Sequence, residues 1–124
     1  MVLADMEAGL EHLSWAGGTL RHVDRLLIVA VPQTKSLLTA RRTVVLARQL
    51  GIPQLSLVGS LVESDADRRR LGDFAGEEGI DVAAHIPFDD AVVDADKIGA
   101  CLLDVAPDGP AVTAIRRLAA DLLA

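Results

Sequence analysis

The sequence has little of several features that would point to common classes of protein. One residue of 124 is a cysteine, Cys101, so a single chain can form neither an internal disulfide nor a thiolate metal site. No apolar run approaches the ~20 residues that a membrane-spanning helix needs. Basic residues number 12 against 18 acidic ones, and the net charge is −6. This balance argues against a nucleic-acid backbone or an anionic membrane as the main partner.

Aromatic residues are also scarce. Trp15, Phe74 and Phe88 are the only three, so the core must be built from aliphatic side chains. Hydrophobic residues still make up 51% of the chain, which is too many for a disordered segment. We therefore expect a single domain over residues 1–124 with a real hydrophobic core. No signal peptide fits the acidic start, so a cytoplasmic protein is expected.

Four apolar runs alternate with stretches of helical periodicity. The runs are Val2–Ala4, Arg25–Val31, Gln54–Gly59 and Asp81–Ile86. Continuous apolar runs of this length are typical of strands that are buried on both faces. Because strands and helices alternate, the sequence predicts βαβ units. The expected fold class is α/β, with a parallel sheet of about four strands flanked by helices.

Two helices are predicted between these strands. The stretch Gln33–Leu50 carries apolar residues at spacings of three and four, and Gly51 supplies a C-terminal stop. Ser64, followed three residues later by Asp67, resembles a capping box. It opens a helix that is expected to run to about Glu78.

A further helix is predicted at the end of the chain. Pro110 suits the first helical position, and Asp108 is a plausible cap before it. The helix is expected to bury its apolar stripe: Ala111, Ile115, Leu118 and Leu122.

Polar side chains gather in the loops that follow the predicted strands. In parallel α/β sheets, ligands bind at the carboxyl ends of the strands. Any one of these residues could simply cap a helix, but the set as a whole favours a binding site. The candidates are Asp5, Glu7, Glu11, His12, Lys35, Ser36, Ser60, Glu63, Asp89 and Asp90.

The first of these loops has the pattern of a nucleotide switch. A short apolar run ends in Asp5, and Gly9 follows four residues later. In phosphate-binding α/β proteins, such an acid holds Mg²⁺, and a nearby glycine lets the loop respond to the γ-phosphate. The loop G-x-x-x-x-G-K-[ST], which cradles the phosphates, does not occur in the 124 residues. The sequence therefore resembles the C-terminal half of a nucleotide-dependent switch protein.

The stretch DMEAGLEHL at 5–13 resembles the Walker B and switch II region of the carbon monoxide dehydrogenase accessory ATPases. Those are nickel-insertion factors of the MinD/ParA class of P-loop ATPases. The likeness covers essentially the whole chain and continues through VAVPQTKSLLTARRTVVLARQLGI (29–52), IPFDDAVVDADKIG (86–99) and LLDVAPDGPAVTAIRRLA (102–119). It implies the C-terminal portion of a MinD/ParA-like fold, from Walker B onward.

The resemblance implies ATP and Mg²⁺ as cofactors and assigns roles by position. Asp5 would hold Mg²⁺ through water, and the amide of Gly9 would sense the γ-phosphate. Pro87 and Asp89 match the loop beside the adenine base. Glu11 and His12 match a family signature, and no residue is assigned to catalysis.

Several parts of the family pattern are missing. The phosphate loop with its lysine and the switch I region are missing. The Cys-x-Cys pair that joins two subunits around a metal would lie upstream of residue 1. Where the family has a base-reading Asn-Lys, this chain has Ser60 and Leu61. A serine reproduces the donor and acceptor of an asparagine poorly, and a leucine carries no charge.

Three functions compete on these observations. The first is a fragment or remnant of an ATP-dependent nickel maturation factor that cannot hydrolyse ATP alone and whose client is a carbon monoxide dehydrogenase-type metalloenzyme. The second is a non-catalytic α/β binding module that pairs with a separate P-loop-bearing partner, which the Ser60-Leu61 pair favours. An unrelated small α/β nucleotide or stress-type domain explains the strands but not DMEAGLEHL.

The resemblance also predicts association. In this class the strand that leads into the phosphate loop lies between the Walker B strand and the strand matching Arg25–Val31. Without it, Val2–Ala4 and Arg25–Val31 would face a gap with unpaired backbone groups, which invites pairing with another chain. A homodimer or higher oligomer is expected, with Arg25–Val31 at or near the contact.

Overall fold

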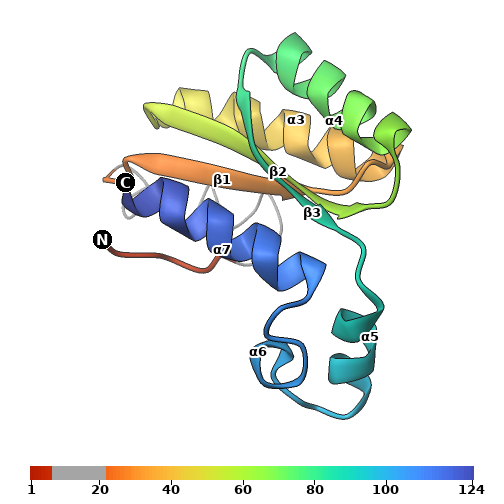
Figure 1. The fold of residues 1–124 in the computed structure, drawn as a ribbon. Helices are drawn as coiled ribbons and strands as arrows, with labels where there is room; N and C mark the ends of the chain where they lie inside the picture. Colours follow the sequence, from red (N-terminus) through yellow and green to blue (C-terminus); the bar gives the residue numbers. More distant parts are fainter. Residues whose placement is uncertain (7–21) are drawn as a thin grey trace.

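The protein is an α/β domain built on a parallel sheet, as the sequence predicts. The computed structural model describes residues 1–6 and 22–124. Three described strands pair in the order β1-β2-β3, and both pairings are parallel (Figure 1). The elements are β1 (Arg25–Ala30), α3 (Thr34–Gln49), β2 (Gln54–Val62), α4 (Asp65–Glu78), β3 (Asp81–Pro87), α5 (Asp90–Lys97), α6 (Leu102–Val105) and α7 (Pro110–Leu123).

The predicted strand at Val2–Ala4 is wrong. The segment has no strand geometry, and Val2 is 95% exposed. A strand this short is stable only when a neighbouring strand accepts its hydrogen bonds. Within the described residues β1 pairs with β2 alone, so the segment has no such neighbour.

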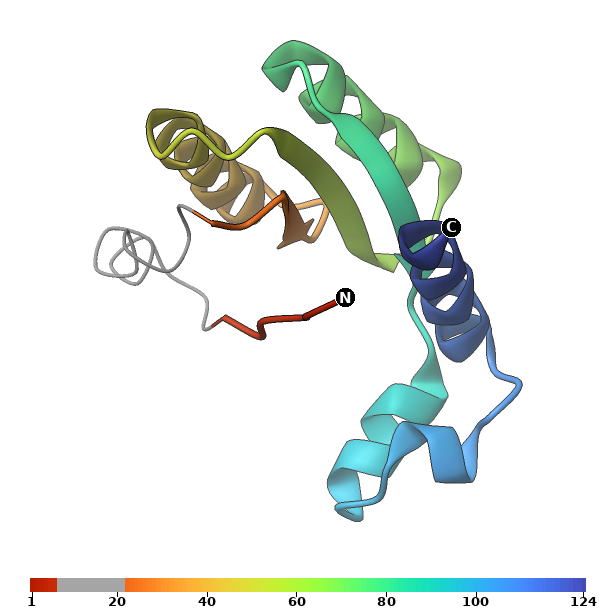
Figure 2. The same cartoon turned by 90° about the vertical axis from the view of Figure 1, so that its left-hand side faces the viewer.

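The main core lies between the sheet and the pair α3 and α4. Both helices cover the same face of the sheet, while α7 lies on the opposite face against β3 (Figure 2). The apolar stripe predicted for α3 is buried as expected, with Val44 fully buried at its centre. The buried cluster comprises Ile28, Ala30, Ala40, Val44, Leu57, Val62, Leu71, Phe74 and Ala75.

The predicted ends of α3 and α4 are confirmed. Gly51, just past α3, has φ +76°, and Gly79, just past α4, has φ +68°, a left-handed conformation that suits glycine. At the start of α4, the amide of Asp67 donates to Ser64 Oγ at 3.2 Å. Asp67 Oδ2 accepts from the amide of Glu63, the residue before the cap, at 2.9 Å, rather than from the amide of Ser64 as in a standard capping box.

The last helix begins as predicted but is capped differently. Pro110 is its first residue, yet Asp108 does not cap it, and Gly109 occupies the cap position without a side-chain hydrogen bond. Asp108 instead points to solvent and lies 3.8 Å from Arg116 Nη1. The burial pattern is also shifted, because among the described elements α7 packs mainly on β3. Ala111 and Val112 are buried, Leu118 and Leu122 are half-buried, and Ile115 is exposed.

A polar triad ties the three strands together at their amino ends. Ser56 Oγ accepts from Arg25 Nη2 at 2.8 Å and donates to Asp81 Oδ1 at 2.8 Å. Ser56 is 1% exposed, so both of its hydrogen bonds satisfy a buried hydroxyl. A shallow cavity of about 420 Å³ lies over this triad, at the end of the sheet opposite to the carboxyl ends of the strands.

No helix in the described ranges combines the length and apolar character that a membrane crossing would require.

Candidate functional site

The carboxyl ends of the three strands meet at one edge of the sheet, because all three are parallel. Val62, the last residue of β2, is in register with Pro87, the last residue of β3. The amide of Phe88 donates to the carbonyl of Val62 at 3.0 Å and fixes the loop after β3 to the end of β2. The structure therefore brings Ser60, Pro87 and Asp89 to the same edge.

The other candidates of the predicted site do not all join this edge. Asp5 is exposed, belongs to no strand and makes no hydrogen bond to the described residues. Gly9, Glu7, Glu11 and His12 lie outside the described residues. The assignment of Asp5 to Mg²⁺ and of Gly9 to the γ-phosphate stays a prediction.

The remaining candidates have local structural roles. Ser36 Oγ accepts from the amide of Val31 at 3.0 Å, which closes the turn from β1 into α3. Glu63 contributes its amide to the cap of α4. Lys35 and Asp90 are exposed in the first turns of α3 and α5.

The end of β2 has an irregular backbone where the family reads the base. The register against β3 shifts between Gly59 and Val62, and Leu61 adopts φ +54°. A non-glycine residue in this region costs of order 1–3 kcal/mol. Leu61 is exposed, while Ser60 is half-buried. The pair therefore offers one hydroxyl and an apolar side chain.

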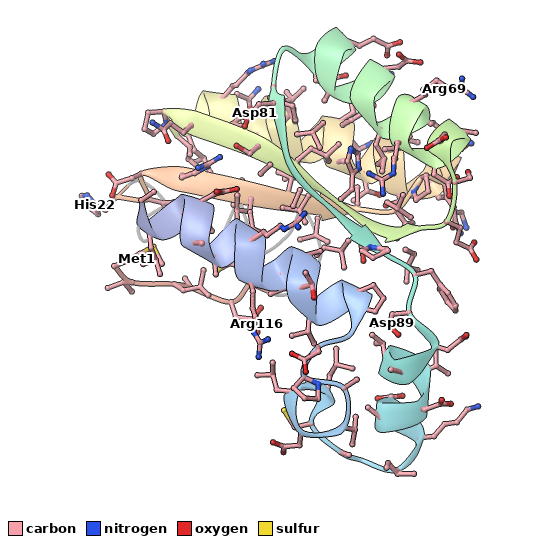
Figure 3. The ribbon with its side chains drawn as sticks, viewed as in Figure 1. Met1, His22, Arg69, Asp81, Asp89 and Arg116 are labelled. Carbon is pink, nitrogen blue, oxygen red and sulfur yellow. The ribbon has the colours of Figure 1, made fainter. Side chains whose placement is uncertain are left out.

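Asp89 joins two helices at this edge (Figure 3). Its Oδ1 accepts from the amide of Ala91, at the start of α5, at 3.0 Å. Its Oδ2 accepts from the amide of Ala111, at the start of α7, at 3.2 Å. The positive ends of both helix dipoles thus converge on one carboxylate. The resemblance places Asp89 beside the base, but both of its oxygens already cap helices.

His85 lies on the other side of this region, under α4. A Cβ built on Gly59 would lie 3.2 Å from His85 Nδ1, and that nitrogen is buried without a hydrogen-bond partner among the described residues. Burial lowers the pKa of His85 below 6.5, and the positive charge of Arg68 lowers it further. This position suits a histidine that packs inside the domain.

The lowered pKa of His85 predicts a pH-dependent stability. Between the folded-state pKa and 6.5 the unfolded chain binds more protons than the folded one, so the free energy of unfolding falls as the pH falls below 6.5. We expect His85→Gln to lose less stability than the wild type between about pH 7 and about pH 5, as measured by urea unfolding. His22→Gln, at an exposed position, is the matched control. Equal losses in the wild type and in His85→Gln would contradict this role.

The described residues do not by themselves fit Mg²⁺-ATP. No group of three His, Cys, Asp or Glu side chains that could hold a metal ion occurs in residues 1–6 and 22–124. Cys101 is exposed and isolated. At this edge the described residues offer a hydroxyl at Ser60 and the loop at Pro87, which could face a base.

Comparisons with known proteins support a specific kinship. No protein-family model matches the chain. The chain is 39% identical over 100 residues to "Uncharacterized ATP-binding protein MJ0823" of Methanocaldococcus jannaschii, with 80% of this chain and 38% of that protein covered. It is 40% identical over 106 residues to "Carbon monoxide dehydrogenase accessory protein CooC" of Rhodospirillum rubrum, with 86% of this chain and 39% of that protein covered.

Solved structures show the same fold. MinD of Aquifex aeolicus superimposes with a TM-score of 0.70 at 20% identity, over 84% of this chain and 45% of that one. A ParA family ATPase of Chlorobium tepidum gives 0.66 at 23% identity, over 83% and 42%. The resemblance to the carbon monoxide dehydrogenase accessory proteins and the MinD/ParA fold are thereby confirmed. The chain spans about two fifths of the length of the curated relatives that it matches.

Proposed function

Proceeding from this kinship, we propose that the chain is one part of an ATP-dependent accessory protein for metallocentre assembly. Nickel is its cargo, and a carbon monoxide dehydrogenase-type enzyme in the cytoplasm is its client. The observation that carries the proposal is the 40% identity to the accessory protein CooC over 86% of the chain. The matched residues cover 39% of that relative. In this proposal the phosphate-binding elements belong to another polypeptide segment.

By itself the chain does not hydrolyse ATP in this account. Phosphoryl transfer depends almost entirely on positioning and electrostatic stabilisation of the phosphates. Asp5 would hold Mg²⁺ through water, Gly9 would face the γ-phosphate, and Ser60 and Pro87 would lie beside the base. Without a phosphate cradle these residues supply only a small part of the stabilisation that the reaction needs.

The free edge of β1 is where a P-loop-bearing partner would dock. Within the described residues only β2 pairs with β1, so the other side of β1 presents unpaired backbone groups. Val29, on β1, is 66% exposed although strands in such sheets are normally covered on both faces. A partner that adds the strand and helix of the phosphate loop would cover both features. The predicted homodimer through Arg25–Val31 would use the same edge and stays a prediction.

A non-catalytic binding module is the second candidate function. It is favoured by Leu61, an exposed apolar residue where the family has a charged one, and by Ser60 in place of the asparagine that reads the base. In this version the chain still pairs with a P-loop-bearing partner, but the site has lost its selectivity for adenine.

Calorimetric titration with Mg-ATP separates this proposal from a self-sufficient ATPase. We expect the chain alone to bind no tighter than the millimolar range, about −4 kcal/mol, because the phosphate cradle is absent from its sequence. The ATP-binding relative from M. jannaschii serves as the positive control under the same conditions. A micromolar dissociation constant for this chain would overturn the proposal.

A further inference from the structure

The segment that follows β3 forms a small lobe with an apolar surface. This α5–α6 lobe, residues 90–105, extends away from the sheet in both views (Figures 1 and 2). Ile98 is 74% exposed and Leu103 is 55% exposed. Val92, Val93 and Val105 are exposed as well. Contiguous apolar surface on a protruding element usually marks a site of protein–protein contact.

A groove on this lobe has mainly apolar walls, with one carboxylate at Asp94 and one ammonium group at Lys97. It has a volume of about 370 Å³ and is lined by Ala91, Asp94, Ala95, Lys97, Ile98 and Val105. Between residues 90 and 104 the sequence has four aspartates against one lysine. None of the four forms an ion pair within the part of the chain that the structure describes. The lobe as a whole is therefore negatively charged, and its groove suits an apolar segment that also carries positive charge.

The outer surface of α3 has the complementary character. Lys35, Leu38, Arg42 and Val45 follow each other at helical spacings of three and four, so they form one stripe, and all four are exposed. The helix has four basic residues and no acidic one. Two of them, Arg41 and Arg48, are engaged by Glu77 and Glu78 of α4, as far as the described residues show. Lys35 and Arg42 are in no ion pair with the described residues.

We infer that the outer stripe of α3 in one copy of this chain docks into the α5–α6 groove of a second copy. On α3 the order is Leu38, Arg42, Val45; on α5 and its C-cap it is Ala91, Asp94, Ile98. Each set covers seven residue steps, about 10 Å at helical rise. Two helices laid side by side at the usual 8–10 Å place the guanidinium of Arg42 opposite the carboxylate of Asp94, with apolar contacts on either side.

The contact joins different surfaces of the two copies. In both views the sheet lies between α3 and the α5–α6 lobe, so one chain cannot close the contact on itself (Figures 1 and 2). Each copy offers both surfaces, so association proceeds head to tail. The contact uses neither the edge of β1 nor the carboxyl edge of the sheet, and it does not depend on the proposed function.

Sedimentation of single variants is the first half of the test. Wild-type chain should show association that strengthens with concentration. Arg42→Glu, which places like charges opposite each other, and Ile98→Asp, which places a charge in the groove, should each weaken it at least about tenfold. Both positions are exposed, so circular dichroism of each variant should match the wild type. The charge swap Arg42→Glu with Asp94→Arg in one chain should restore association.

Mixing the two single variants is the decisive half. The Arg42→Glu chain keeps an intact groove, and the Ile98→Asp chain keeps an intact α3 stripe. A mixture should form a one-to-one complex with twice the mass of the 13.1 kDa chain. It should grow no larger, because the two surfaces left unused are the two mutated ones, and both carry negative charge. The inference is overturned if the wild type stays monomeric, if either single variant associates like the wild type, or if the mixture forms no complex.

Discussion

Replacing Asp89 by alanine should lower the free energy of unfolding by about 2–3 kcal/mol, because one carboxylate caps two helices and each cap is worth about 1 kcal/mol or more. Ala91 and Ala111 donate to separate oxygens of Asp89, at 3.0 and 3.2 Å. Neither α5 nor α7 has another side-chain cap at its start. Urea unfolding measures the loss directly.

Two further variants distinguish capping by Asp89 from a general effect of charge. Asp89→Asn keeps one acceptor oxygen, so it should lose about half of the stability that Asp89→Ala loses. Asp90→Ala removes the exposed neighbouring carboxylate and should change stability by less than about 0.5 kcal/mol. Hydrogen exchange in the first turns of α5 and α7 should speed up in Asp89→Ala. Equal losses in Asp89→Ala and Asp90→Ala would show that the two caps contribute nothing specific.

Adding a single methyl group at Gly59 should destabilise the core by about 2–3 kcal/mol. A Cβ there would lie 2.5 Å from Leu71 Cδ1, and Leu71 is fully buried between β2 and α4. The leucine cannot move aside, because close-packed neighbours surround it. Gly59→Ala unfolding in urea measures this cost.

A double-mutant cycle shows whether Leu71 is the cause. Leu71→Val removes the clashing Cδ1, so Gly59→Ala should cost much less in that background than in the wild type. Gly72→Ala is the control, since a Cβ at that exposed helical position meets nothing within 4 Å. It should stabilise the protein by about 0.5–1 kcal/mol. Equal costs of Gly59→Ala in both backgrounds would rule out the clash.

Much of the fold could be predicted because its signals are local. The continuous run Arg25–Val31, the box at Ser64 and the stop at Gly79 each determine the backbone over a few residues. The prediction of a strand at Val2–Ala4 was wrong, because a strand needs a neighbouring strand and three residues of sequence cannot show whether there is one. The prediction that Asp108 caps α7 was wrong for a similar reason. The observed cap, Asp89, lies 22 positions before Ala111, and tertiary packing alone brings the two together.

The lobe formed by α5 and α6 went unnoticed, although Asp89 followed by apolar residues at helical spacing is a recognisable start signal. The site could be predicted only in part. Parallel strands place Ser60, Pro87 and Asp89 at one edge, and that follows from the topology. What each side chain does there depends on partners: both oxygens of Asp89 are occupied by helix amides, and Leu61 has a left-handed backbone.

We propose that the residues of this chain support ATP hydrolysis only together with a phosphate loop, and a reconstituted ATPase assay tests this proposal most directly. The partner is the part of R. rubrum CooC that lies outside the 106 matched residues, where we expect the phosphate loop. We predict no hydrolysis by either polypeptide alone and at least about tenfold more by their mixture. That gain should be lost with Asp5→Ala in this chain and kept with Asp24→Ala. Hydrolysis by this chain alone, or a mixture as inactive as its parts, would contradict the account.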